Sequence, residues 1–139
     1  MHLNPLGKLV REEWLTTAKL RANVRLGEFE VMPNHLHGII VIVPCHAGED
    51  GIPAIQRKTG DLPVAPTGPK KGSLGAILGN FRAAVTRRIR RLLNRPRFEV
   101  WQRDYYDHII RDDEDWERIR EYILENPKNW ASDPENPSK

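Results

Sequence analysis

The sequence predicts an α+β domain, an antiparallel sheet with helices packed on it. Two strand-like stretches, residues 24–32 and 35–43, are joined by a short turn at Pro33 and Asn34, which favours antiparallel neighbours. Three other stretches repeat apolar residues at helical spacing: residues 5–20, 73–93 and 113–126. At 139 residues the chain is long enough to bury the core of one domain, which spans residues 1–139.

The composition is that of an ordinary globular protein. Hydrophobic residues make up 39% and charged residues 29%, and no apolar run is long enough for a bilayer span or a signal peptide. The single cysteine, Cys45, excludes an internal disulfide and fits a reducing compartment, so we expect a cytoplasmic protein. The net charge of +3 indicates little about a partner.

The N-terminal helix and the first strand each carry a local signal. Asn4 is a typical N-cap, and Pro5 suits the first helical position. The apolar stripe of this helix consists of Leu6, Leu9, Val10, Trp14 and Leu15. In the strand that follows, Gly27 interrupts the alternation of apolar residues, which predicts a bend or bulge near the glycine.

The middle of the chain divides into a loop and a basic helix. Residues 44–72 are rich in Gly, Pro, Lys and Thr without periodicity, which predicts a long mobile loop. Ser73 then caps a helix that ends at Asn94-Arg95-Pro96. Seven arginines fall in one short stretch: Arg82, Arg87, Arg88, Arg90, Arg91, Arg95 and Arg97. Such a face suits phosphates, although an ordinary solvated helix face has the same pattern.

The last third of the chain predicts a strand followed by a helix. Residues 98–110 read as the strand, and Asp112-Asp113 opens the helix, where acids suit the helix dipole. The expected packing stripe of this helix is Trp116, Ile119, Tyr122 and Ile123. Pro127 is expected to close the helix, and residues 131–139 to form a frayed polar tail.

Two histidines stand at the start of the apolar run Gly38 to Val43, which predicts a strand buried on both faces. Since side chains alternate along a strand, His35 and His37 share one face and can converge on one cation. Gly38 leaves room for a ligand or another backbone to approach. Two alternatives stay open. The histidines are bonded to backbone or water, or they bind zinc together with Cys45 and His46.

Tyr122 and Asn126 are four residues apart on the last helix and therefore lie on the same face. Taken singly, the tyrosine suits the core and the asparagine suits a helix C-terminus. Together with His35 and His37, however, the amide supplies a hard oxygen beside two imidazoles. Such a set with open positions would hold Mg²⁺ or Mn²⁺ as an electrophile.

Four blocks of the chain resemble one family: VMPNHLHGIIVI, SLGAILGNFRAAVTRRI, WQRDYYDHIIRD and YILENP. They resemble the REP-associated tyrosine transposases, which are relatives of the single-strand insertion-sequence transposases in the HUH endonuclease superfamily. The resemblance extends from Leu3 to about Asn126. It implies a ferredoxin-like HUH fold and a DNA transposase associated with the nucleoid of a prokaryotic cell.

The resemblance also implies roles for particular residues. His35, His37 and Asn126 would be the metal ligands, with Mg²⁺ or Mn²⁺ as the cofactor, and Tyr122 would be the nucleophile. The implied reaction cleaves and rejoins single-stranded hairpin or repeat DNA through a 5′-phosphotyrosine. The arginines expected to bind this DNA are Arg82, Arg87, Arg88, Arg91 and Arg103.

The chain departs from the family at its start. Family members begin with an extra strand, of the type YFVTICT, ahead of the helix that starts here at Asn4. We therefore expect an exposed sheet edge, and either a monomer or a homodimer formed through that edge. Because the turn between Ile110 and Asp113 is short, we expect Tyr122 to reach the histidines of its own chain.

Alternative functions also follow from the sequence. A degenerate relative would bind hairpin DNA or RNA without cutting it. Tyr105 and Tyr106 are competing nucleophiles, but they face opposite ways on the expected strand and neither has an amide ligand at helical spacing. We expect both to serve as sheet aromatics. His108 is expected to bond within the fold rather than to a metal.

Overall fold

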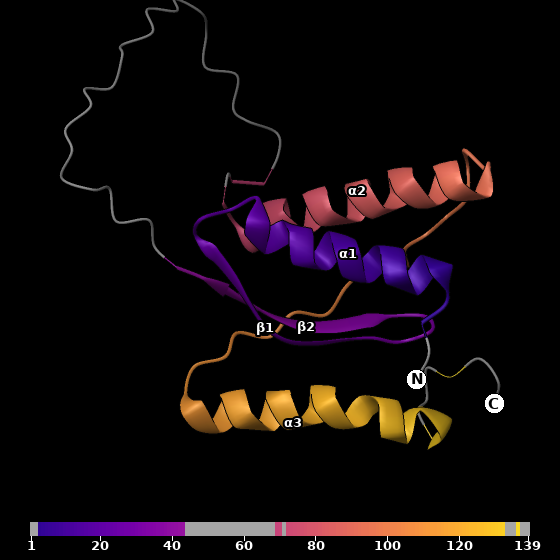
Figure 1. Ribbon diagram of the computed structural model, residues 1–139. Helices are drawn as coiled ribbons and strands as arrows, with labels where there is room; N and C mark the ends of the chain where they lie inside the picture. Colours follow the sequence, from indigo (N-terminus) through magenta and orange to yellow (C-terminus); the bar gives the residue numbers. More distant parts are fainter. Residues whose placement is uncertain (1–2, 44–68, 71, 133–135, 137–139) are drawn as a thin grey trace, which may run out of the picture.

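A computed structural model describes residues 3–43, 69–70, 72–132 and 136. The elements are α1 (Pro5–Lys19), β1 (Val24–Val31), β2 (Leu36–Ile42), α2 (Leu74–Leu93), α3 (Asp113–Asn129) and a 3₁₀ turn, η1 (Trp130–Ser132). The two strands form an antiparallel sheet with α1 and α2 on one side and α3 on the other (Figure 1). The predicted α+β class is therefore confirmed.

The predicted caps fix where the helices begin. The side chains of Asn4, Ser73 and Asp112 accept hydrogen bonds from backbone N–H groups of the first turns of α1, α2 and α3. Asn94 ends α2 in the left-handed conformation, with a φ of 51°. Each short polar side chain satisfies a backbone group that the helix end leaves without an intrahelical partner.

The register of the sheet determines which residues share each face. Phe29 pairs with Gly38 and Glu30 pairs with His37, and the register shifts between Leu26 and Phe29. This shift is the predicted bulge beside Gly27. A Cβ on Gly27 would lie 3.0 Å from Cβ of Ile39, so the bulge brings the two strands close.

The main core lies between the sheet and the pair α1 and α2. Its buried members are Leu9, Trp14, Phe81, Val85 and Ile89. The rings of Trp14 and Phe81 meet edge to face with centroids 5.2 Å apart. A Cβ on Gly38 would lie 2.5 Å from Cζ2 of Trp14. The space that Gly38 leaves is therefore filled by this indole, and the prediction that it admits a ligand or another backbone is wrong.

Strand β2 is not buried on both faces as predicted. Of its residues only Ile39 is buried, and Ile42 is 40% exposed. In the described part of the chain β2 has a single neighbour, β1, so one edge of each strand carries no further strand. An apolar run predicts a fully buried strand only when strands on both sides and layers on both faces cover it.

Residues 98–110 do not form the predicted strand. They run from α2 towards α3 as irregular chain, seen as the orange trace in Figure 1. The segment is attached to α2 by side chains. The Nε1 atom of Trp101 donates to the Arg82 carbonyl at 3.1 Å, and Arg82 donates to the Gln102 carbonyl at 2.7 Å. Alternation alone does not make a strand when no neighbouring strand offers backbone partners.

The end of α3 also differs from the prediction. Pro127 lies inside the helix, which continues to Asn129 and then into η1. Proline removes one backbone N–H, but its fixed φ is helical, so the helix can continue through it. As a consequence Trp130 extends the same helical face. The predicted tail at 131–139 and the loop at 44–72 lie largely outside the described residues.

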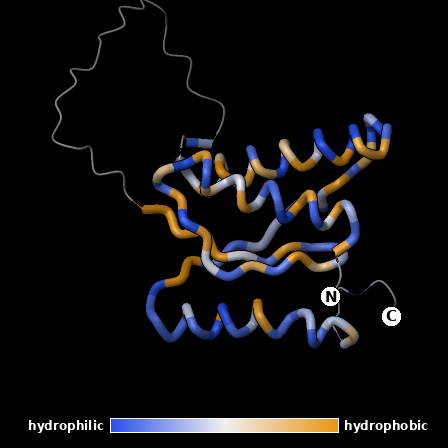
Figure 2. The backbone as a smooth tube through the Cα atoms, in the orientation of Figure 1, coloured by the Kyte–Doolittle hydropathy of each residue, from blue (hydrophilic) through white to orange (hydrophobic). Residues whose placement is uncertain are grey.

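Figure 2 shows that α3 is mostly hydrophilic, with isolated apolar positions, whereas apolar residues are frequent in the two strands. Within the described ranges, no helix has both the length and the apolarity needed to cross a membrane.

Candidate functional site

The two histidines meet at the start of β2, on the side of the sheet that faces α3. Their ring centroids lie 4.6 Å apart with the planes inclined at 72°. Nδ1 of His35 is 2.7 Å from Oδ1 of Asn34. When Nδ1 donates to that oxygen, Nε2 carries the lone pair. This is the tautomer that a metal-binding histidine needs when a second group orients it.

Tyr122 lies against this pair. Its ring centroid is 5.2 Å from that of His37, at an interplanar angle of 76°. The side chain is 58% exposed, so the expectation that Tyr122 belongs to the packing stripe is wrong. Ile123, the next residue, is the buried one. A phenol that is accessible to solvent and packed on an imidazole can be reached by a large substrate.

Asn126 and Trp130 continue the face of α3 that begins at Tyr122, because the three are spaced by four residues. The ring of Trp130 lies 5.9 Å from that of His35. Since Tyr122 contacts His37 and Trp130 contacts His35, α3 runs opposite to β2 at this point. Asn126 therefore lies one turn from each aromatic residue, along the stretch of helix that faces the two imidazoles.

Asn126 is 4% exposed, and its Nδ2 atom is enclosed without a hydrogen-bond partner among the described residues. An enclosed amide end without a partner is costly. Rotation of the amide by 180° exchanges the nitrogen for the carbonyl oxygen at that position. An oxygen there would add a hard donor to the imidazoles of His35 and His37, and such a set suits a divalent cation. These residues therefore fit the metal that the family resemblance implies.

The alternative zinc site would be built from carboxylate, thiolate and imidazole ligands alone. In the described part of the chain, no three His, Cys, Asp or Glu side chains are grouped so that they could hold a metal ion. Cys45 and His46, the other members of the predicted zinc set, lie outside the described residues.

Helix α3 is held on the sheet by contacts on either side of the site. Arg120 Nε donates to Glu28 Oε1 on β1 at 3.2 Å, and this bond is the main reason why the pKa of Arg120 is raised. Near the start of the helix, Trp116 packs close to Gly27, where a Cβ would be 3.3 Å from the indole. With Ile123 buried, these contacts fix the rotation of α3 that turns Tyr122 towards His37.

The arginines expected to bind DNA fall into two groups. Arg82 is bonded to the Gln102 carbonyl and lies over the Trp101 ring, and Arg88 pairs with Glu12 and Glu13 on α1. Those bonds raise the pKa of Arg88. Arg87, Arg91 and Arg103 are exposed. Helix α2 lies on the opposite side of the sheet from α3, so its basic surface and the histidine site are on different sides of the molecule (Figure 1).

The competing tyrosines lie away from the histidines. Tyr105 is 50% exposed and Tyr106 is 90% exposed, and both belong to the irregular segment rather than to a sheet. The prediction that they serve as sheet aromatics is therefore wrong. Within the described chain, the tyrosine ring that contacts a histidine ring is that of Tyr122.

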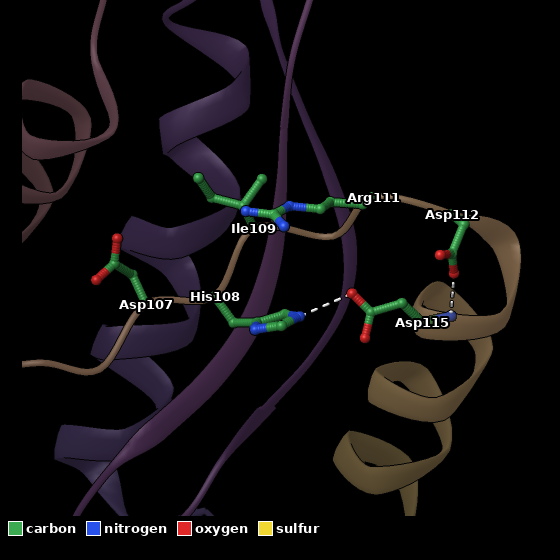
Figure 3. Close-up of a pocket in the computed structure, with 6 residues that line it drawn as sticks. All are labelled: Asp107, His108, Ile109, Arg111, Asp112 and Asp115. Carbon is green, nitrogen blue, oxygen red and sulfur yellow. Dashed lines mark hydrogen bonds and ion pairs between the residues drawn. The ribbon is translucent and has the colours of Figure 1, made fainter.

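His108 bonds within the fold, as predicted. Its Nε2 atom is 2.7 Å from Asp115 Oδ2, a contact drawn in Figure 3. That contact is the main cause of the lowered pKa of Asp115. The pair borders a pocket of about 410 Å³, lined by Asp107, His108, Ile109, Arg111, Asp112 and Asp115. The pocket is at the first turn of α3, about 10 Å along the helix from Tyr122 at the usual rise per residue.

Sequence comparison defines a family for this chain. It is 41% identical to a protein of Haemophilus influenzae named only as an uncharacterized protein, over 133 residues. The match covers 96% of this chain and 71% of the relative. The chain therefore belongs to the same family as that protein. No family model matches the chain. No solved structure matches it either.

Two residues beside the histidines are not among the predicted site residues. Trp130 lies beyond the predicted helix, because Pro127 is expected to close that helix, although the spacing of four residues from Asn126 places Trp130 on the same helical face. Glu30 lies opposite His37 in the sheet. The sequence contains a signal for this position. Two strands joined by a short turn pair from the turn outward, so that Val31 pairs with Leu36 and Glu30 pairs with His37.

Proposed function

We propose that this protein is a metal-dependent tyrosine transposase or endonuclease that cleaves and rejoins single-stranded DNA. The observation that carries the proposal is the contact of the Tyr122 ring with His37, which itself packs on His35. A solvent-accessible phenol beside two imidazoles and an enclosed amide combines a nucleophile with a cation-binding donor set. The resemblance of the four sequence blocks to the REP-associated tyrosine transposases supports the same reading.

The proposed chemistry is a transesterification. The phenolic oxygen of Tyr122 attacks the scissile phosphorus while the bond from phosphorus to the 3′ oxygen breaks. The phenol loses its proton to solvent, and the departing 3′ oxygen takes one up. The products are a 5′-phosphotyrosine and a free 3′-hydroxyl, and the reverse attack by a 3′-hydroxyl rejoins the strand.

His35, His37 and Asn126 are the proposed ligands of Mg²⁺ or Mn²⁺. When bound, the cation offsets negative charge on the phosphate and polarises it towards attack. The contribution of the protein is to hold the phenol close to the phosphate. Packing of α3 on β1 through Arg120 and Ile123 supplies that positioning.

The proposed substrate is a hairpin-forming single strand. The exposed arginines Arg87, Arg91 and Arg103 are suited to the phosphates of this DNA. A DNA strand bound by α2 would have to pass around an edge of the β-sheet to reach Tyr122. The site is proposed to form within one chain, in a monomer or in a homodimer joined through the sheet edge. We propose that the protein acts in the cytoplasm, on nucleoid DNA.

A cleavage assay tests the proposal. End-labelled single-stranded hairpin DNA is incubated with the protein and Mn²⁺, then separated under denaturing conditions. The wild type is expected to yield a shortened strand and a covalent protein–DNA species, and Tyr122→Phe is expected to yield neither. Binding without any cleavage by the wild type would instead favour the non-catalytic hairpin-binding alternative.

A further inference from the structure

The segment that connects α2 to α3 passes from one side of the sheet to the other. Helix α2 lies with α1 on one side, α3 lies on the opposite side, and residues 94–112 join them (Figure 1). The protein chain here follows the route that a DNA strand bound by α2 would have to take to reach Tyr122. The side chains that this segment exposes are therefore candidates for contact with the strand.

The segment is attached to a helix at each end. At the α2 end, the Nε1 atom of Trp101 donates to the Arg82 carbonyl at 3.1 Å. At the α3 end, Nε2 of His108 lies 2.7 Å from Oδ2 of Asp115. These two contacts fix where the residues between Trp101 and His108 lie.

Between these attachments the chain is exposed and its backbone is unpaired. Every residue from 102 to 109 is exposed. Within the described part of the chain, no backbone–backbone hydrogen bond involves residues 99–111. Tyr105 is half exposed, and Tyr106 is almost fully exposed. Adjacent aromatic rings that the core does not use are typical of an interaction surface.

The residues around the tyrosines favour a nucleic-acid strand over a protein as the partner. The centre of a protein interface is depleted of charged residues, whereas Arg103, Asp104 and Asp107 directly flank the two tyrosines here. In proteins that bind single-stranded nucleic acid, successive bases stack on exposed aromatic rings. Bases within a duplex are covered on both faces by their neighbours, so such a surface selects a single strand.

The charges of the segment indicate which interaction holds the strand. Arg103 and Arg111 are exposed and can contact phosphates, but Asp104 and Asp107 are exposed as well and offset their charge. The attraction of phosphates along the segment is therefore weak, and stacking has to supply most of the affinity there. The exposed arginines of α2 supply the phosphate contacts instead.

We propose that residues 102–109 form a stacking segment, which guides a single-stranded arm of the DNA from the α2 side of the sheet to the α3 side. Bases of the arm stack on Tyr105 and Tyr106, which bind the strand and do not act as nucleophiles. This inference rests on the proposed function, because it supplies the route from the basic surface of α2 to Tyr122.

The test compares the affinity of the full chain for two fluorescent DNA hairpins in EDTA, where no cleavage is expected. One hairpin carries single-stranded oligothymidine arms at both ends, and the other is blunt. Tyr106→Ala is expected to weaken binding of the hairpin with arms at least about fivefold, as loss of one stacked base does, and to leave binding of the blunt hairpin unchanged.

Two control variants accompany Tyr106→Ala. Tyr106→Phe keeps the ring and is expected to bind both hairpins like the wild type. Leu20→Ala removes another exposed apolar side chain, at the end of α1, and is also expected to bind like the wild type. If Tyr106→Phe loses as much affinity as Tyr106→Ala, the hydroxyl group and not stacking is responsible, and the inference is overturned.

Salt dependence separates stacking from charge. The ring of Tyr106 neutralises no phosphate, so Tyr106→Ala is expected to keep the wild-type slope of log affinity against log salt. A reduced slope in this variant would mean that phosphate contacts were lost, and it would overturn the inference.

The remaining outcomes separate this inference from the proposed function. If Tyr106→Ala loses no affinity for the hairpin with arms, the stacking segment is overturned, whereas cleavage by Tyr122 still stands. If the wild type binds neither hairpin, the inference and the DNA-binding part of the proposed function fail together. If Tyr106→Ala lowers the mass of the protein in light scattering, the tyrosine lies between two copies of the chain, and the inference is overturned.

Discussion

The two faces of the small sheet differ in what they pack against. On one face Phe29 and Gly38 form a pair, and the Trp14 indole occupies the space above the glycine. On the other face the adjacent pair is Glu30 and His37, and a tyrosine lies over the histidine. One residue along the same strands separates an apolar core, closed by Trp14, from a polar face on which the Tyr122 side chain is 58% exposed.

This difference indicates how the fold supports the site. Side chains alternate strictly along a strand, so the register that places Gly38 under Trp14 also places His37 opposite Glu30. The α1 and α2 face contributes the packed core, and the α3 face carries the residues of the proposed site. Changes on the first face should therefore alter stability, and changes on the second should alter activity with little loss of stability.

The largest expected effect comes from the histidines. His35→Ala or His37→Ala should reduce DNA cleavage by at least about 100-fold, because a bound cation is worth several kcal/mol at a phosphoryl transition state. Hairpin affinity should change little, since phosphate contacts carry most of it. Cleavage gels and binding titrations on the same samples measure both. Equal loss of binding and cleavage would make the histidines structural.

On the opposite face, Gly38→Ala should lower the free energy of unfolding by about 2 kcal/mol, because the new methyl group meets a rigid indole in a packed core. The control is Gly79→Ala on α2, where a Cβ has nothing within 4 Å. That change should stabilise the protein by up to about 1 kcal/mol through helix propensity. Denaturant titrations compare the two variants. Similar effects of both would mean that Trp14 does not fill the position above Gly38.

A moderate effect is expected from the exposed arginines of α2. The double variant Arg87→Ala, Arg91→Ala should weaken hairpin binding and reduce the slope of log affinity against log salt by about 1.4, or about 0.7 for each phosphate that an arginine no longer neutralises. Arg88→Ala is the control, because its side chain is held by Glu12 and Glu13. It should leave the slope unchanged. An unchanged slope in the double variant would assign DNA binding to another surface.

The smallest expected effect concerns the start of α3. The contact with His108 holds the pKa of Asp115 below its ordinary value. A lowered pKa contributes stability that is present above the pKa of the unfolded chain, about 3.9, and is lost as the pH falls through the folded value. Asp115→Asn should therefore lose less stability on acidification than the wild type.

Melting temperatures between about pH 6 and pH 3 measure this difference, a window that brackets the ordinary pKa of an aspartate. Asp113→Asn is the matched control, since it removes a charge from the same turn without removing the contact with His108. A control variant that behaves like Asp115→Asn would assign the effect to the helix dipole instead.

The sequence was sufficient for features that depend on local chemistry. Caps at Asn4, Ser73 and Asp112, the bulge at Gly27 and the shared face of His35 and His37 follow from backbone groups and strand periodicity. Features that depend on distant partners were predicted less well. Residues 98–110 alternate like a strand but pair with no strand in the described part of the chain, and Gly38 accommodates an indole from α1.

The candidate site shows the same division. The spacing of Tyr122 and Asn126 on one helix was readable, but the exposure of Tyr122 depends on how Ile123 and Trp116 rotate α3 against β1. Arg82 and Arg88 looked like the other arginines in sequence. Their bonds to Gln102 and to the acids of α1 depend on the docking of elements that are remote in the chain.

The most direct test of the account identifies the residue that becomes joined to DNA. The wild type is incubated with single-stranded hairpin DNA and Mn²⁺, treated with nuclease and trypsin, and examined by tandem mass spectrometry. Trypsin separates the candidates, because Tyr122 falls in the peptide of residues 121–128, and Tyr105 and Tyr106 in that of residues 104–111. The account predicts that the added mass of a phosphate-linked nucleotide is found on Tyr122 alone. The same mass on Tyr105 or Tyr106 would contradict the assignment of the active site to the α3 face.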